Sequence, residues 1–158
     1  MSPKNADKRV GVQAWLLVAS AVPAGLIGVI FDNDIATLGK PAWIAVSLMG
    51  FGLVLWWADR LRGSRTTGDF TFIDSVLIGL AQVLALNPGT SRSGITITMA
   101  RMRGFDRDAA ARLSFLMSIP VIGGAVVFQI ASLVRDGIPD GLLAPMIVGI
   151  VAAAISGW

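Results

Sequence analysis

The heptapeptide Pro-Gly-Thr-Ser-Arg-Ser-Gly, residues 88–94, contains an arginine between two serines. The guanidinium of Arg92 can donate two parallel hydrogen bonds to the oxygens of one phosphate group. The hydroxyls of Ser91 and Ser93 can add further donors. We expect Ser93 to cap the helix that follows, so that the free N–H groups of its first turn also face the anion. These residue types therefore predict a phosphate-binding site.

Glycines lie on both sides of this arginine. Gly89 and Gly94 permit unusual backbone angles and a close approach of a ligand. The heptapeptide is not the Walker pattern, because no Gly-Lys-Ser/Thr sequence follows it. Taken alone, such a cluster of Gly, Ser and Pro most often forms a plain turn. The apolar segments around it favour the anion site, because an arginine at membrane depth is costly unless it is paired or hydrated.

The composition is that of an integral membrane protein. Of the 158 residues, 54% are apolar and only 15% are charged, whereas about a quarter of a soluble domain is charged. We therefore attribute the net charge of +3 to residues that set orientation and contact lipid headgroups, and not to nucleic-acid binding. The chain has no Cys, His, Tyr or Glu, which excludes disulfides, thiolate metal sites and imidazole chemistry.

The apolar stretches predict an all-α polytopic membrane protein that forms a single membrane domain over residues 1–158. About 20 residues of helix cross the bilayer core of about 30 Å. Two apolar stretches, 72–86 and 94–102, are too short for this. The Asn-Pro-Gly break between them predicts a re-entrant hairpin over about 72–102, which enters and leaves the membrane on one side. The predicted spans are 12–31, 41–57, 113–133 and 142–158.

The basic residues predict the orientation of these spans. Lys and Arg concentrate at the N-terminus and in the stretches 58–71 and 101–112, while 32–40 and 134–141 carry one each. The positive-inside rule places the three basic stretches in the cytoplasm. A hairpin that returns to its own side makes this count consistent. The chain stops inside an apolar run at Trp158, so we expect it to be a piece of a longer protein.

The stretch IGLAQVLALNPGTSRSGITIT and the following RGFDRDAAARLSFLMSIPVIGGA resemble the second half of the undecaprenyl-diphosphate phosphatases, bacterial membrane enzymes also called bacitracin-resistance proteins. The resemblance is close over residues 73–125. It implies an inverted-repeat architecture in which two re-entrant hairpins meet at mid-membrane. It also implies a multi-pass protein of the bacterial inner membrane, which hydrolyses undecaprenyl diphosphate to undecaprenyl phosphate. That reaction recycles the lipid carrier of peptidoglycan synthesis and confers bacitracin resistance.

In this family the Pro-Gly-x-Ser-Arg-Ser-Gly loop forms one half of the active site. The resemblance implies that Arg92 binds the diphosphate and stabilises transition-state charge, and that Ser91 and Ser93 bind or orient phosphate oxygens. The other half uses paired glutamates and a His-containing stretch, which hold a divalent cation, Mg²⁺ or Ca²⁺, and supply the nucleophile or base. This chain has neither residue type, so we expect it to lack the metal ligands and to be inactive alone. The expected substrate-binding residues are Gly89, Thr90, Gly94 and Gln82.

Several alternatives stay open from the sequence. The chain could belong to a phosphatase whose partner is a polyprenyl diphosphate lipid. It could belong to a secondary transporter or lipid-phosphate translocator that binds an anion at a broken helix without hydrolysis, or to a membrane scaffold. Gln82 suits a hydrogen bond between helices as well as a substrate contact. Asp74 is expected near a helix start, where an acid is favourable. Besides membrane lipids, a homo-oligomeric partner is left open.

Overall fold

The chain folds into helices joined by short connections, as the computed structural model shows for residues 3–30, 40–137 and 141–157. Within these residues, three helices are long and apolar enough to cross a membrane. They are α1 (Pro3–Ile30), α3 (Pro41–Asp59) and α6 (Arg107–Asp136). The shorter helices are α4 (Phe72–Val83), α5 (Arg92–Met102) and α7 (Leu143–Gly157). The protein is therefore a polytopic helical membrane protein, as predicted.

The chain divides into two compact units, Met1–Ile122 and Gly123–Trp158. The first holds α1, α3, α4, α5 and the beginning of α6, and the second holds the rest of α6 and α7. The predicted site lies in the first unit. The single membrane domain and the inverted-repeat architecture stay predictions.

The helices differ from the predicted spans mainly at their ends. The third span was predicted to begin at Leu113, but α6 begins at Arg107. Asp106 explains the difference, because its carboxylate accepts a hydrogen bond from the N–H of Ala109 at 2.7 Å and so caps the helix. The three alanines that follow are strong helix formers. The charged residues before the predicted span therefore form the first two turns of α6.

A helix–loop–helix hairpin occupies the middle of the first unit. Its arms are α4 and α5, and the 3₁₀ turn Leu84–Leu86 follows directly on α4. The hairpin thus covers the predicted range 72–102. With 12 and 11 residues, the arms are about 18 and 17 Å long, which is short of the bilayer core of about 30 Å. Neither arm crosses a membrane alone.

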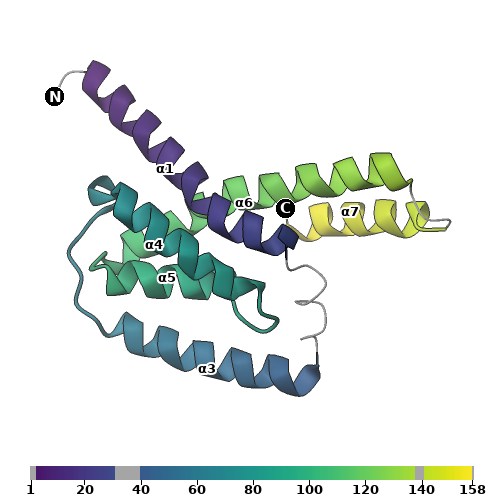
Figure 1. The fold of residues 1–158 in the computed structure, drawn as a ribbon, viewed down its shortest axis with the longest axis horizontal. Coiled ribbons are helices and arrows are strands. Elements are labelled where there is room, and N and C mark those ends of the chain that lie inside the picture. The colour runs from purple at the N-terminus through teal and green to yellow at the C-terminus, as the bar shows by residue number, and fades with distance from the viewer. Residues whose placement is uncertain (1–2, 31–39, 138–140, 158) are drawn as a thin grey trace. The chain divides into compact units, whose positions relative to one another are not determined.

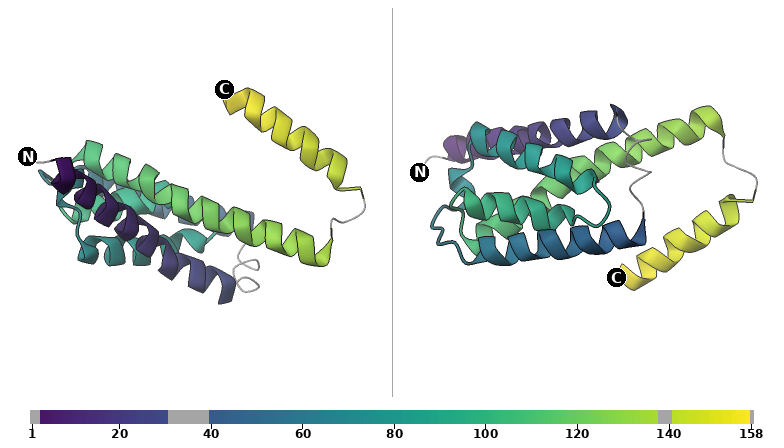
Figure 2. Two further views of the ribbon diagram at one scale, coloured as in Figure 1. Left: turned by 90° about the horizontal axis from the view of Figure 1, so that it is seen from above. Right: turned by 60° about the horizontal axis from the view of Figure 1, so that its bottom comes forward.

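Each arm of the hairpin packs against a different long helix, α4 against α1 and α5 against α3 (Figures 1 and 2). Small and polar residues line the contact between α1 and α4. The Ser75 hydroxyl donates to the carbonyl oxygen of Leu16 at 2.6 Å. A Cβ placed on Gly79 would lie only 2.5 Å from the carbonyl oxygen of Ser20. The two backbones meet here as small residues allow in membrane helix pairs.

We expect Gly79→Ala to destabilise the first unit by about 1–3 kcal/mol, because the added methyl group must push the α1 backbone away. Thermal unfolding in detergent measures the effect. Gly50→Ala is the matched control, because a Cβ at this glycine of α3 meets nothing within 4 Å. An unchanged midpoint for Gly79→Ala would show that the close approach is not needed for stability.

Candidate functional site

The tip of the hairpin is docked on the beginning of α3. Trp43 donates its indole N–H to Asn87 Oδ1 at 2.7 Å, and Asn87 Nδ2 donates to the Ser47 hydroxyl at 3.0 Å. Gly89 has φ +93°, and a Cβ there would lie 2.4 Å from the carbonyl oxygen of Ile44. Only glycine satisfies both the backbone angle and the space. Contacts of both its side chains and its backbone therefore hold the loop against α3.

The hairpin tip and the start of α5 lie alongside the middle part of α3. Gly89 lies against Ile44, near the start of that helix, and a Cβ on Gly94 would be 3.7 Å from Leu55 Cδ2. Residues 90–93 connect these two points. Because α3 is long and apolar enough to span a membrane, the Ser-Arg-Ser sequence lies beside the middle of a candidate span and not beside its ends.

Ser91, and not Ser93, caps α5. The hydroxyl oxygen of Ser91 accepts a hydrogen bond from the N–H of Gly94 at 3.2 Å, and its carbonyl accepts from the N–H of Ile95 at 2.9 Å. The predicted cap was therefore wrong by two residues. Ser93 lies in the first turn of α5 instead. Both serines remain next to the free N-terminal end of the helix.

The first turn of α5 leaves donors without partners. Within the described residues, the N–H groups of Arg92 and Ser93 make no hydrogen bond, and the half-buried side chain of Arg92 has neither a hydrogen bond nor an ion pair. A helix start attracts anions through such N–H groups and through the helix dipole. An unpaired guanidinium joins them here. The arrangement can bind an oxyanion such as a phosphate group.

The other expected substrate-binding residues divide between two places. The Thr90 hydroxyl accepts a hydrogen bond from Asn87 Nδ2 at 3.1 Å and lies in the loop with Gly89 and Gly94. Gln82 is buried on α4, and its Nε2 donates to the carbonyl oxygen of Ser20 at 3.4 Å. The structure thus gives Gln82 the contact between helices that the sequence left open. A contact between Gln82 and substrate stays a prediction.

A buried carboxylate at the base of the hairpin fixes the connection from α3 to α4. Asp74 accepts hydrogen bonds from Arg65 at 2.5 and 3.0 Å, from Arg103 at 2.9 Å and from the Thr71 hydroxyl at 2.7 Å. Burial raises the pKa of Asp74, but these hydrogen bonds outweigh it and hold the pKa below its usual range. Asp74 is at the start of α4, as predicted, and its role is structural.

The described residues do not fit the divalent cation that the family resemblance implies. No three of their His, Cys, Asp or Glu side chains lie close enough together to hold a metal ion. The hairpin tip offers guanidinium, hydroxyl and N–H donors, which suit an anion, and it has no carboxylate, the usual ligand of a divalent cation. The hairpin tip can therefore bind an anion, and anion binding by this loop stays a prediction.

Sequence reasoning missed the residues that hold the loop in place. The sequence indicated Asn87 only as part of a helix break, and it predicted no contact for Trp43. Their contact joins residues 44 positions apart. A polar residue directly before Pro-Gly, in an otherwise apolar stretch, was the one available signal.

Comparison with known proteins identifies the family. The family model "Bacitracin resistance protein BacA" matches residues 2–158. The undecaprenyl-diphosphatase of Geobacter metallireducens is 44% identical over 147 residues, which cover 91% of this chain and 55% of the relative. That of Pelobacter propionicus is 46% identical over 147 residues, covering 91% and 54%. That of Chromohalobacter salexigens is 41% identical over 160 residues, covering 99% and 58%. The chain spans little more than half the length of these relatives and belongs to the bacitracin resistance protein BacA family.

Proposed function

We propose that this chain supplies the phosphate-binding half of an undecaprenyl-diphosphatase of the bacterial inner membrane. The observation that carries the proposal is the guanidinium of Arg92, which has no partner within the described residues and lies at the start of α5, beside the middle of a candidate span. The relatives named above are undecaprenyl-diphosphatases, which supports the reaction and the polyprenyl diphosphate substrate. The recycled product would serve peptidoglycan synthesis and underlie bacitracin resistance.

The residues of the loop have distinct roles in this proposal. Arg92 binds two oxygens of the diphosphate and stabilises the charge that develops when the bridging P–O bond breaks. The N–H groups of Arg92 and Ser93 and the hydroxyls of both serines, Ser91 and Ser93, donate to the remaining oxygens. Gly89 keeps the loop against α3, so these donors are held in position before substrate arrives.

Hydrolysis needs groups beyond this loop. Phosphoryl transfer requires a nucleophile and charge neutralisation, usually with a metal. A divalent cation, Mg²⁺ or Ca²⁺, would neutralise diphosphate charge on the glutamate- and histidine-bearing half-site. This chain has no Glu and no His, so we propose that the chain by itself binds the diphosphate without cleaving it.

A chimaera tests the proposal. Residues of this chain replace the matched 147 residues of the Geobacter metallireducens relative, and phosphate release from undecaprenyl diphosphate is measured in detergent. We expect release by the chimaera and none by this chain alone. The intact relative is the control for the assay.

Two results would overturn the proposal. A folded, membrane-inserted chimaera that releases no phosphate while the intact relative does would remove the catalytic role. If that chimaera instead moved polyprenyl diphosphate across vesicle membranes, the loop would belong to a translocator. Phosphate release by the chain alone would contradict the division into two half-sites.

A further inference from the structure

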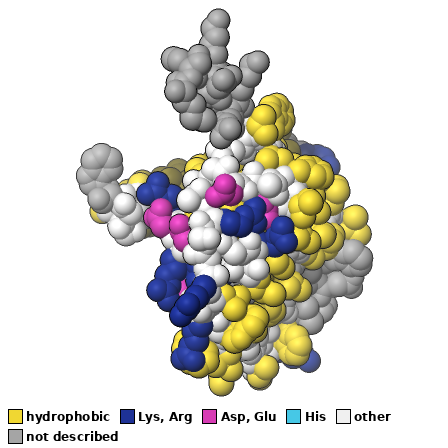
Figure 3. All heavy atoms as spheres, turned by 90° about the vertical axis from the view of Figure 1, so that its left-hand side faces the viewer, with side chains coloured by type: hydrophobic (Ala, Val, Ile, Leu, Met, Phe, Trp, Pro, Cys, Tyr) yellow, Lys and Arg dark blue, Asp and Glu magenta, His cyan; other side chains and the backbone are white. Residues whose placement is uncertain are grey.

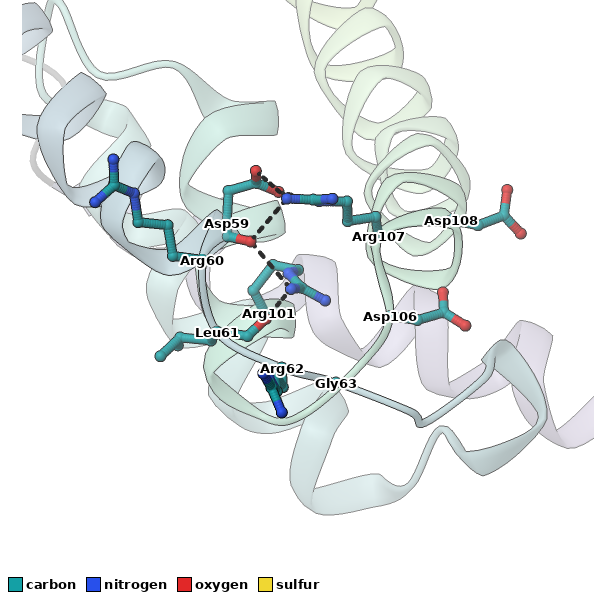
Figure 4. A pocket seen from close by; sticks show the side chains of 9 residues that line it. All are labelled: Asp59, Arg60, Leu61, Arg62, Gly63, Arg101, Asp106, Arg107 and Asp108. Carbon is teal, nitrogen blue, oxygen red and sulfur yellow. Dashed lines mark hydrogen bonds and ion pairs between the residues drawn. The ribbon is translucent and has the colours of Figure 1, made fainter.

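A second basic site lies at the opposite end of α5 from Arg92. Here α3 ends, α5 ends and α6 begins, and Arg and Asp side chains gather on the surface beside hydrophobic ones (Figure 3). A pocket of about 520 Å³ opens among these elements, within the usual range of about 300–1,000 Å³ for ligand sites. Its charged lining comes from Asp59, Arg60, Arg62, Arg101, Asp106, Arg107 and Asp108 (Figure 4).

Arg101 lines this pocket as a buried cation without an acidic partner. Its side chain is 5% exposed, and its guanidinium donates to the carbonyl oxygens of Asp59, Leu61 and Phe105. Arg101 Nε has no hydrogen-bond partner, and no carboxylate of the described residues lies within ion-pair distance. Carbonyl dipoles compensate only part of a buried charge. Arg101 therefore contributes a positive charge to the lining of the pocket.

The acidic side chains of the pocket are already engaged. Asp59 pairs with Arg107 through two hydrogen bonds of 2.7 and 2.8 Å. Asp106 caps α6, and Asp108 pairs with Arg112 at 2.8 Å. Asp59 acts on Arg101 through space, but none of the three forms an ion pair with it.

Two exposed arginines at the rim also lack acidic partners in the described part of the chain. The guanidinium of Arg60 lies 3.6 Å from the centre of the Trp56 ring, and Arg62 makes no ion pair or side-chain hydrogen bond there. Within the described residues, Arg60, Arg62 and Arg101 thus form no ion pair, and Arg60 points away from Arg101 (Figure 4). The chemistry of the pocket matches a phosphate oxyanion.

The surroundings of the pocket indicate where that phosphate comes from. Trp56 and Trp57 are exposed at the end of α3, and tryptophans at the end of a membrane span lie at the level of the headgroups. Basic pockets between helices at this level bind anionic lipid headgroups. We propose that the part of the pocket lined by Arg62 and Arg101 binds one phosphate group, carried by an anionic phospholipid. Arg101 lies nine residues after Arg92, about 14 Å along α5, so this site is separate from the hairpin tip and independent of the proposed function.

Lipid retention measured by native mass spectrometry tests the proposal. The chain is taken from nanodiscs of phosphatidylcholine with added phosphatidylglycerol, and the bound lipids are counted. We expect one retained phosphatidylglycerol and about fivefold weaker retention in Arg62→Ala, because one arginine near the phosphate is lost. Lys40→Ala is the charge-matched control, since Lys40 precedes the other end of α3 and is exposed. The fold of Arg62→Ala is checked by its unfolding midpoint, and Arg60→Ala is a second control with unchanged retention expected, because Arg60 points away from Arg101 (Figure 4).

A competition arm distinguishes the sources of the phosphate. If inorganic phosphate at millimolar concentration does not displace the phospholipid, the lipid headgroup is the ligand. If inorganic phosphate binds instead, with the same dependence on Arg62, the pocket is a phosphate site for a soluble anion. Equal retention in Arg62→Ala and Lys40→Ala, or equal retention of phosphatidylcholine and phosphatidylglycerol, would overturn the proposal.

Discussion

Replacing Arg92 with lysine in the chimaera is expected to lower kcat for phosphate release by about 100-fold or more. Lysine keeps the positive charge but cannot donate two parallel hydrogen bonds to one phosphate group. The side chain of Arg92 has no partner within the described residues, so the change removes no contact from the fold. Steady-state kinetics with undecaprenyl diphosphate measure kcat and KM, and the unfolding midpoint reports on structure.

Arg112→Lys is the matched control for this result. Arg112 is also an arginine on an apolar helix, but its side chain is 68% exposed and pairs with Asp108 one turn away. Such a surface pair contributes less than about 1 kcal/mol, so we expect kcat within twofold of the parent chimaera. Equal kcat values for Arg92→Lys and the parent would refute the role of Arg92 in the transition state.

Replacing Asp74 with alanine is expected to cost about 3 kcal/mol of folding free energy, near the lower end for a broken buried ion pair. Asp74 is fully buried, while the side chains of Arg65 and Arg103 are 28% and 36% exposed. The two guanidinium groups would lose their shared acceptor but keep some contact with solvent. Unfolding in detergent measures the loss. Asp108→Ala, at a side chain 74% exposed, should change stability by less than about 0.5 kcal/mol.

The same carboxylate predicts a dependence of stability on pH. The pKa of Asp74 is lower in the folded state than the unfolded value of about 3.9, so folding is favoured while the group is ionised. Its contribution is complete above that unfolded value and is lost as the pH falls below about 4. We expect the parent chain to lose stability over this range more steeply than Asp74→Asn. Parallel curves for the two proteins would mean that Asp74 does not contribute through its charge.

The sequence predicted the hairpin because two features determine it, the shortness of the two apolar stretches and the helix-breaking Asn-Pro-Gly between them. Stretches of 12 and 11 helical residues around Asn-Pro-Gly cannot cross a bilayer, and the observed arms fall in the range 72–102. The cap of α5 was less determined, because Ser91 and Ser93 are equally good cap residues. The turn before them decides, and its course depends on the left-handed Gly89 pressed against α3.

Contacts between distant residues could not be predicted from spacing. Arg65, Arg103 and Asp74 meet although the arginines lie 9 and 29 positions from the acid. Arg101 belongs to a stretch whose charges predicted only orientation, yet its side chain is buried. Its burial depends on hydrogen bonds to backbone carbonyl groups at the end of α3. Every residue type supplies such a carbonyl, so the sequence does not indicate these contacts.

The separate attachment of the hairpin arms has a mechanical consequence. α4 packs against α1, where Gly79 contacts Ser20. α5 packs against α3, and the hairpin tip is hydrogen-bonded to the same helix. Any sideways displacement of α1 from α3 must then be absorbed within the turn that joins the arms. Arg92 follows that turn directly, as the first residue of α5, so a rearrangement of the two spans would reorient its guanidinium even though Arg92 lies on neither span.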